Sequence, residues 1–268
     1  MATFFGEVKY LVSRAYDEED DDEDAPGITY SVRMELSEGG QGKMDGVEAL
    51  LVSYGTLVTD FCETLVLGEQ CQEVGRVYVE AQNGPSVEDT GDFHPRKPIP
   101  SCLYLTPTSL LVCCVSKDVT AAVASRFAQK VLSLIKPSCL VMVLSSHHYD
   151  ALKGNYAPQG EDNCVVHSLH SSTFPHTPVY PQLPQPAILD SVPAAVVTEC
   201  VVGQRQCVAY PVFTETYSTG DLDLVAGALQ RVFQGKPFQK YVSVRLDAKK
   251  LHQYRTTNPR RENLDLYL

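Results

Sequence analysis

Two short, uninterrupted apolar runs most constrain how this chain can fold. One is "ALLVSY" at residues 49–54, which ends at Gly55, and the other is "CLVMVL" at residues 139–144. Strands of this length without alternating polar residues are typical of a sheet that is covered on both faces. Such strands need helices above and below them, so the two runs favour an α/β fold.

Segments with helical periodicity stand between the apolar runs. Apolar residues recur every three or four positions at residues 56–67, 119–135 and 221–233, and a further helix is predicted at residues 191–203, with Pro193 near its first turn. Pro137 ends the second of these helices. We therefore expect a single three-layer domain over residues 27–253, with a central mixed sheet flanked by helices.

The remaining strands are predicted from alternation and turns. Residues 28–36, "ITYSVRMEL", alternate strictly and indicate a half-buried strand, and "GRVYVEA" at 75–81 indicates a short one. Residues 101–116 are interpreted as two strands joined by a turn at Pro107, whereas the glycine-rich residues 38–46 are interpreted as a loop. Residues 206–215 form a strand that lies at an edge or contains a bulge, because Pro211 lacks the N–H of a ladder.

Three segments lie outside this regular pattern. Residues 1–26 contain the run "DEEDDDED" at 17–24, which indicates a solvated segment or, alternatively, a docking strip for a basic partner. Residues 149–190 are rich in proline and are interpreted as a long loop or insertion without a core element. Residues 254–268 are charged and are expected to form a flexible C-terminal tail.

The composition excludes several function classes. The net charge is −11, so the chain has no excess of basic residues with which to bind nucleic acid. The nine cysteines are odd in number, lack a Cys-x-x-Cys pair and fall largely in apolar runs, which favours reduced thiols in a cytoplasmic protein. We expect no signal peptide and no membrane insertion, because no apolar run approaches the ~20 residues that a membrane helix requires.

The search for catalytic motifs leaves one candidate. Neither a phosphate-binding glycine loop nor a Gly-x-Ser-x-Gly elbow is present. Residues 145–150, "SSHHYD", follow a buried strand, where α/β sheets place ligand sites. They could serve a hydrolase or nucleoside-processing enzyme that uses Ser145 or Ser146 with His147 or His148, or they are a polar strand exit. We favour the second interpretation and expect no enzyme.

A metal site is a weaker possibility. His167, His170, His176 and Cys164 lie close in sequence, but they lack the regular four-ligand spacing of structural zinc sites and an acidic ligand. We therefore expect neither a bound metal nor a cofactor.

The last three residues, Leu266, Tyr267 and Leu268, are large and apolar, although chain ends are usually polar. Burying Leu266 and Tyr267 in a partner could yield about 1.5–3 kcal/mol each, and a lysine bonded to the terminal carboxylate ~1.5–3 kcal/mol. Ordering the residues costs ~1–2 kcal/mol apiece. The tail is thus predicted to be a weak anchor that works together with a second contact.

Several stretches resemble one family of assembly proteins. The start "ATFFGEV" with the acidic run after it, the stretch "VPAAVVTECVVGQRQCVAYPVFTETYSTGDLDLVAGAL", the late "TTN" and the Tyr-containing terminus are similar to the proteasome assembly chaperone 1 family. The resemblance implies a non-catalytic chaperone that forms a heterodimer with proteasome assembly chaperone 2. The pair would bind proteasome α-subunits, promote assembly of the α-ring and prevent α-ring dimerisation.

The resemblance also assigns a role to the tail. Members of the family carry a C-terminal hydrophobic-Tyr-x motif that inserts between α-subunits. On this chain the motif falls on Leu266, Tyr267 and Leu268, with the carboxylate of Leu268 meeting a pocket lysine. Proteasome activators use the same type of tail, so the assembly role rests on the other matching stretches. The resemblance further implies a cytoplasmic protein with an association with the endoplasmic reticulum.

Overall fold

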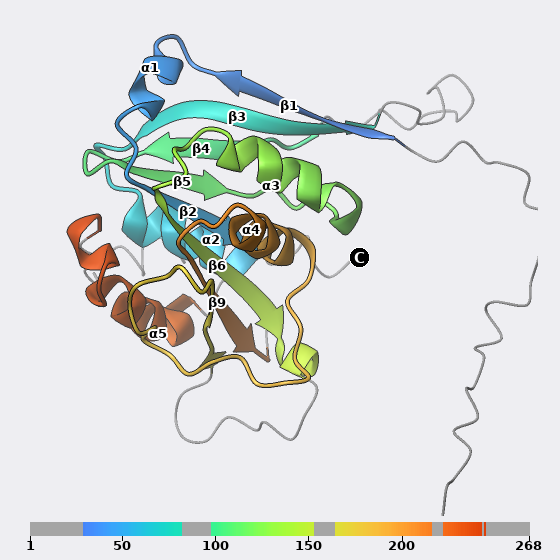
Figure 1. The fold of residues 1–268 in the computed structure, drawn as a ribbon, viewed down its shortest axis with the longest axis vertical. Coiled ribbons are helices and arrows are strands. Elements are labelled where there is room, and N and C mark those ends of the chain that lie inside the picture. Colours follow the sequence, from blue (N-terminus) through green and yellow to red (C-terminus); the bar gives the residue numbers. More distant parts are fainter. Residues whose placement is uncertain (1–28, 82–97, 153–163, 216–221, 243, 245–268) are drawn as a thin grey trace, which may run out of the picture.

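A mixed sheet forms the middle layer of the domain, with helices on both faces (Figure 1). The computed structural model describes residues 29–81, 98–152, 164–215, 222–242 and 244. Within them the strand order is β1-β3-β4-β5-β2-β6-β9-β7, and β8 also pairs with β9. The predicted three-layer α/β architecture is confirmed.

The parallel centre of the sheet consists of the apolar strands. β5 (Leu110–Cys114), β2 (Ala49–Tyr54), β6 (Leu140–His148) and β9 (Cys207–Thr214) are adjacent and parallel. Nearly every residue of these strands is buried, because helices cover both faces. The apolar runs therefore identified the central strands correctly.

Antiparallel strands extend this centre on both sides. β1 (Tyr30–Leu36), β3 (Gln72–Ala81) and β4 (Ser101–Leu105) continue the sheet beyond β5, and β4 and β5 form the hairpin predicted around Pro107. Arg33 and Glu35 of β1 are exposed, which confirms the wet face predicted for that strand. On the opposite side, β7 (Cys164–Val166) and β8 (Leu169–His170) pair with β9.

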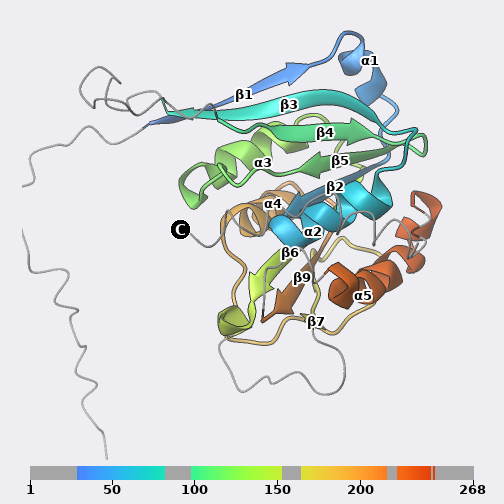
Figure 2. The same ribbon diagram turned by 180° about the vertical axis from the view of Figure 1, so that it is seen from behind.

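The helices divide between the two faces (Figures 1 and 2). α3 (Ala124–Leu132) and α4 (Ser191–Val202) pack on one face, where Phe127 and Val196 contact the core. α2 (Thr56–Phe61) and α5 (Leu222–Gln234) pack on the other, where Phe61 stacks on Phe233 with ring centroids 6.0 Å apart. All four helices were predicted, although two begin or end differently. α2 passes into a π-helix at Cys62–Val66, and α3 is preceded by a 3-10 turn at Ala121–Val123.

Two predictions about irregular segments are wrong. The glycine-rich stretch contains the short helix α1 (Gly40–Met44), held on the domain by the buried side chain of Met44. Residues 149–190 do contribute to the core, through 3-10 residues Tyr149–Leu152, strands β7 and β8, and the buried side chain of Phe174. A further 3-10 turn, Phe238–Lys240, follows α5.

Pro211 lies at neither an edge nor a bulge. β9 pairs with β6 on one side and with β7 and β8 on the other. β7 and β8 pair with β9 in one continuous register, so neither side of this ladder contains the extra residue of a bulge. The ladder is instead interrupted between them, where Pro211 has no N–H to donate and its carbonyl accepts from His167 N at 3.1 Å.

Candidate functional site

The structure brings Ser145 and His147 together near the end of β6. Side chains alternate along a strand, so these two residues lie on the face that α4 covers, whereas Ser146 lies on the other face. The Nε2 atom of His147 is 2.8 Å from the Ser145 hydroxyl. The sequence had placed these residues beyond the strand, but they belong to it.

Burial governs what this pair can do. Ser145 is fully buried and the ring of His147 packs on Phe213, with centroids 5.5 Å apart. Burial lowers the pKa of His147, an effect that the charge of Asp190 opposes. The pair is thus a neutral hydrogen bond inside the domain, and the Ser145 hydroxyl is not exposed to a substrate.

The other members of the predicted cluster point elsewhere. His148 is partly exposed and its Nδ1 lies 2.9 Å from a carboxylate oxygen of Asp150, which is itself exposed. The Ser146 side chain is buried beside Gly55. Ser146 and His148 therefore do not join the Ser145–His147 pair. Both serines are buried, so neither hydroxyl is accessible as a nucleophile.

The candidate metal ligands are also separated. The ring of His167 lies against Phe213, and the rings of His170 and His176 both lie against Phe174. Cys164 is buried in β7. Among the residues that the structure describes, no group of three or more His, Cys, Asp or Glu side chains could hold a metal ion. Within the same residues, no helix is long and apolar enough to cross a membrane.

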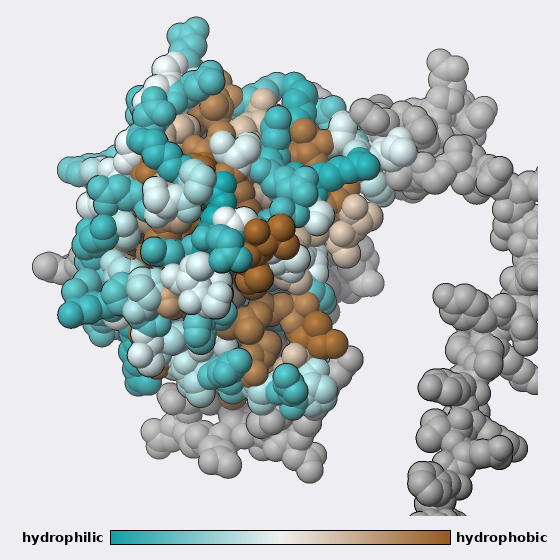
Figure 3. Space-filling view, in the orientation of Figure 1, coloured by the Kyte–Doolittle hydropathy of each residue, from teal (hydrophilic) through white to brown (hydrophobic). Residues whose placement is uncertain are grey.

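The most unusual surface of the described chain lies on α4. A surface helix normally has one apolar and one polar side, but α4 is apolar nearly all round. Its buried side packs in the core through Val192, Val196 and Cys200. Its outward side includes Val201 and Val202, which are 46% and 75% exposed. Figure 3 shows apolar side chains gathered in this part of the molecule.

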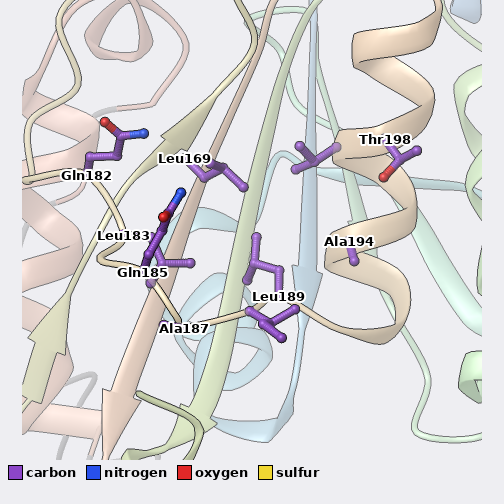
Figure 4. Close-up of a pocket in the computed structure, with 10 residues that line it drawn as sticks. Leu169, Gln182, Leu183, Gln185, Ala187, Leu189, Ala194 and Thr198 are labelled. Atoms are coloured by element: carbon purple, nitrogen blue, oxygen red, sulfur yellow. The ribbon is translucent and has the colours of Figure 1, made fainter. Parts of the chain in front are cut away.

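A pocket adjoins the outward side of α4 (Figure 4). It has a volume of about 350 Å³ and lies between α4 and the segment that leads into it. Ile188 is 64% exposed at this pocket. The lining consists of Leu169, Gln182, Leu183, Gln185, Ala187, Ile188, Leu189, Ala194, Val197 and Thr198.

We use the name α4 surface for this pocket together with the outward side chains of α4. Those side chains are Ala194, Ala195, Thr198, Val201 and Val202. Ala194, Thr198 and Val201 follow one another at helical spacing, so they form a continuous line along the helix. A contiguous apolar surface of this kind is typical of a protein–protein contact.

The sequence pattern predicted the helix, but the apolar surface on it was not predicted. The signal was present, because residues 192–202 contain no charged residue except Glu199 and therefore cannot form a polar face. The predicted anchor residues Leu266, Tyr267 and Leu268 lie outside the described residues, as does the acidic run at 17–24.

Comparisons with known proteins agree on one family. The family model described as proteasome assembly chaperone 4 (PAC1) matches residues 1–264. Proteasome assembly chaperone 1 of Xenopus laevis is 28% identical over 240 residues, which cover 80% of this chain and 83% of the relative. The protein of the same name from Danio rerio is 28% identical over 258 residues, covering 87% and 91%.

A solved structure has the same fold. A Thermoplasma acidophilum protein of unknown function superimposes with a TM-score of 0.51 at 12% identity, covering 86% of this chain and 93% of its own. Because the family model spans nearly the whole chain, the conclusion does not depend on the modest pairwise identity. The chain belongs to the proteasome assembly chaperone family.

Proposed function

We propose that this chain acts as a heterodimer with proteasome assembly chaperone 2, in which it binds proteasome α-subunits, promotes α-ring assembly and prevents α-rings from pairing. The observation that carries the proposal is the family match over residues 1–264, together with relatives named proteasome assembly chaperone 1. The apolar α4 surface supports a role in protein binding, and the buried Ser145–His147 pair does not favour an enzyme.

The C-terminal tail is the proposed anchor on the α-ring. Leu266 and Tyr267 would enter a groove between α-subunits, and the carboxylate of Leu268 would meet a lysine there. The cost of ordering three residues offsets most of the free energy that their burial yields, so the tail adds to the contact of the docked domain. We place this activity in the cytoplasm, without a cofactor.

Deleting Leu266–Leu268 tests the anchor. We expect α-ring intermediates to bind at least about ten-fold more weakly, because two buried side chains and a charged hydrogen bond are lost. Tyr267→Ala should act in the same direction, and one glycine appended after Leu268 should also weaken binding by moving the carboxylate. Binding is measured by biolayer interferometry on purified α-subunit rings.

Two controls separate the anchor from other effects. Thermal unfolding and binding to chaperone 2 should not change in the deletion variant, because the tail lies beyond the predicted domain. Unchanged ring binding would refute the anchor. Native mass spectrometry then distinguishes an assembly chaperone, which binds ring intermediates, from an activator, which binds finished particles.

A further inference from the structure

α4 exposes to water a side that the physics of a helix would place in a core. The outward side of α4 consists largely of side chains that form no hydrogen bonds with water, namely Ala194, Ala195, Val201 and Val202. Ile188 extends the same apolar surface across the pocket. A second chain that covered them would gain the free energy of burying this area. We infer that the α4 surface is the docking site for the second chaperone of the heterodimer, which places a large, uncharged apolar side chain in the pocket.

This inference rests on the proposed heterodimer and adds which surface is used and what chemistry it accepts. Charge is the first argument. None of the ten residues that line the pocket is ionisable. The one charged residue in the middle of α4, Glu199, already accepts a hydrogen bond from Gln129 Nε2 at 2.8 Å. A charged segment would lose its hydration here without a counter-charge, so the docking segment must be neutral.

The same argument excludes the chain's own tail as the occupant. Asp265 adjoins the apolar residues of the tail, and the pocket offers neither a lysine nor an arginine to its carboxylate. The tail is suited to a pocket with a cation, whereas the α4 surface is suited to a segment without charge. The two contacts therefore require different partners.

Size and lining define the anchor. A volume of about 350 Å³ accommodates a leucine or an aromatic side chain, which is the kind of residue that dominates binding at interfaces. The side-chain amides of Gln182 and Gln185, labelled in Figure 4, can both donate to and accept from the backbone of the incoming segment.

The rest of the contact is expected on the neighbouring helix. A stable interface uses about 20–30 residues a side, more than the α4 surface contains. α3 packs beside α4 and carries polar, outward residues such as Gln129 and Lys130. The α4 surface thus supplies an apolar core, and α3 supplies part of a polar rim.

Charged substitutions on this surface test the inference. Val202→Lys places a cation at the C-terminal end of α4, where the helix dipole favours it, so the variant should fold normally. Ile188→Lys places the same charge at the pocket. Each should weaken binding to purified proteasome assembly chaperone 2 at least about ten-fold by titration calorimetry, because a buried Val or Ile is worth about that much.

The matched control is Ile99→Lys. Ile99 is also an exposed large apolar residue, at 43%, but it is not part of the α4 surface, and its backbone N–H donates to Asp118 Oδ2 at 2.6 Å. The affinity of the Ile99→Lys variant for chaperone 2 should equal that of the wild type. Thr198→Val, which removes a hydroxyl from the middle of the surface, should bind at least as tightly. Hydrogen exchange of residues 182–202 should slow when chaperone 2 binds.

Each alternative has its own result. If the wild type binds chaperone 2 and both lysine variants bind equally well, this docking site is wrong while the heterodimer stands. If the wild type does not bind chaperone 2, both proposals fail. A self-association that Val202→Lys abolishes would assign the surface to a second copy, and exchange that speeds up when Leu264–Leu268 is deleted would assign it to the tail. Either of these overturns the inference.

Discussion

A close backbone approach between β2 and β6 makes the substitution Gly55→Ala a quantitative test of the structure. Gly55 has φ of +93° and ψ of 147°, a conformation that side chains rarely adopt. A methyl group added there would lie 2.3 Å from the Ser146 hydroxyl and 3.1 Å from the Ser146 carbonyl oxygen. Two separate penalties therefore apply.

The magnitudes follow from these two contacts. The backbone conformation costs about 1–3 kcal/mol for a residue other than glycine. Overpacking against Ser146 adds about 1–3 kcal/mol. We expect Gly55→Ala to lower the free energy of unfolding by roughly 2–6 kcal/mol, measured by urea unfolding with circular dichroism.

A second substitution isolates the clash. The buried Ser146 hydroxyl has no hydrogen-bond partner among the described residues, so Ser146→Ala alone should be neutral or slightly stabilising. The double variant Gly55→Ala/Ser146→Ala should be more stable, by about 1 kcal/mol or more in the free energy of unfolding, than the sum of the two single changes predicts. The reason is that the Ser146 oxygen, which clashes with the added methyl group, has been removed. Gly42→Ala is the control, since nothing lies within 4 Å of the added methyl. An additive double variant, or a Gly55→Ala cost no larger than that of Gly42→Ala, would refute the reasoning.

Two further predictions concern titration and thiol reactivity. Burial lowers the pKa of His147 in the folded state, so the unfolded chain binds the proton more tightly. Stability should therefore fall as the pH drops below about 6.5, the ordinary histidine value. Urea unfolding at pH 7.5 and 5.5 should show a smaller difference for His147→Gln, and an unchanged difference would contradict this assignment. Burial also raises the pKa of the Cys62 and Cys113 thiols well above the usual value, and the hydrogen bond with Cys200, together with burial, raises the pKa of Cys207. Mass spectrometry after brief maleimide treatment should find label first at the half-buried Cys71 and Cys102, and equal labelling of all cysteines would contradict the packing.

Local patterns were sufficient for the central strands and the longer helices of this fold. The apolar runs that became β2 and β6 are buried on both faces, so nearly all of their positions are apolar and the pattern is clear. The hairpin around Pro107 was predicted because proline fixes the backbone of a turn. Such features depend on neighbours in sequence.

Features that depend on distant segments were not predictable in the same way. β7 and β8 are short and lie in a proline-rich stretch, and only their pairing with β9 makes them strands. Pro211 was assigned to an edge or a bulge because the sequence does not show that the ladder beside it is interrupted. The meeting of Ser145 with His147 follows strand alternation, but the burial of Ser145 depends on the elements packed above it.

The position of β9 has a consequence for how the chain is made. β7 and β8 precede β9 in the chain, yet among the described strands they pair only with β9. A nascent chain therefore emerges with β6 complete and its outer edge open, and this edge stays unpaired until residues 207–214 of β9 have left the ribosome. An open, apolar strand edge is a template for aggregation. A chaperone of this architecture is consequently itself at risk during its own synthesis, and truncations upstream of β9 should yield insoluble protein.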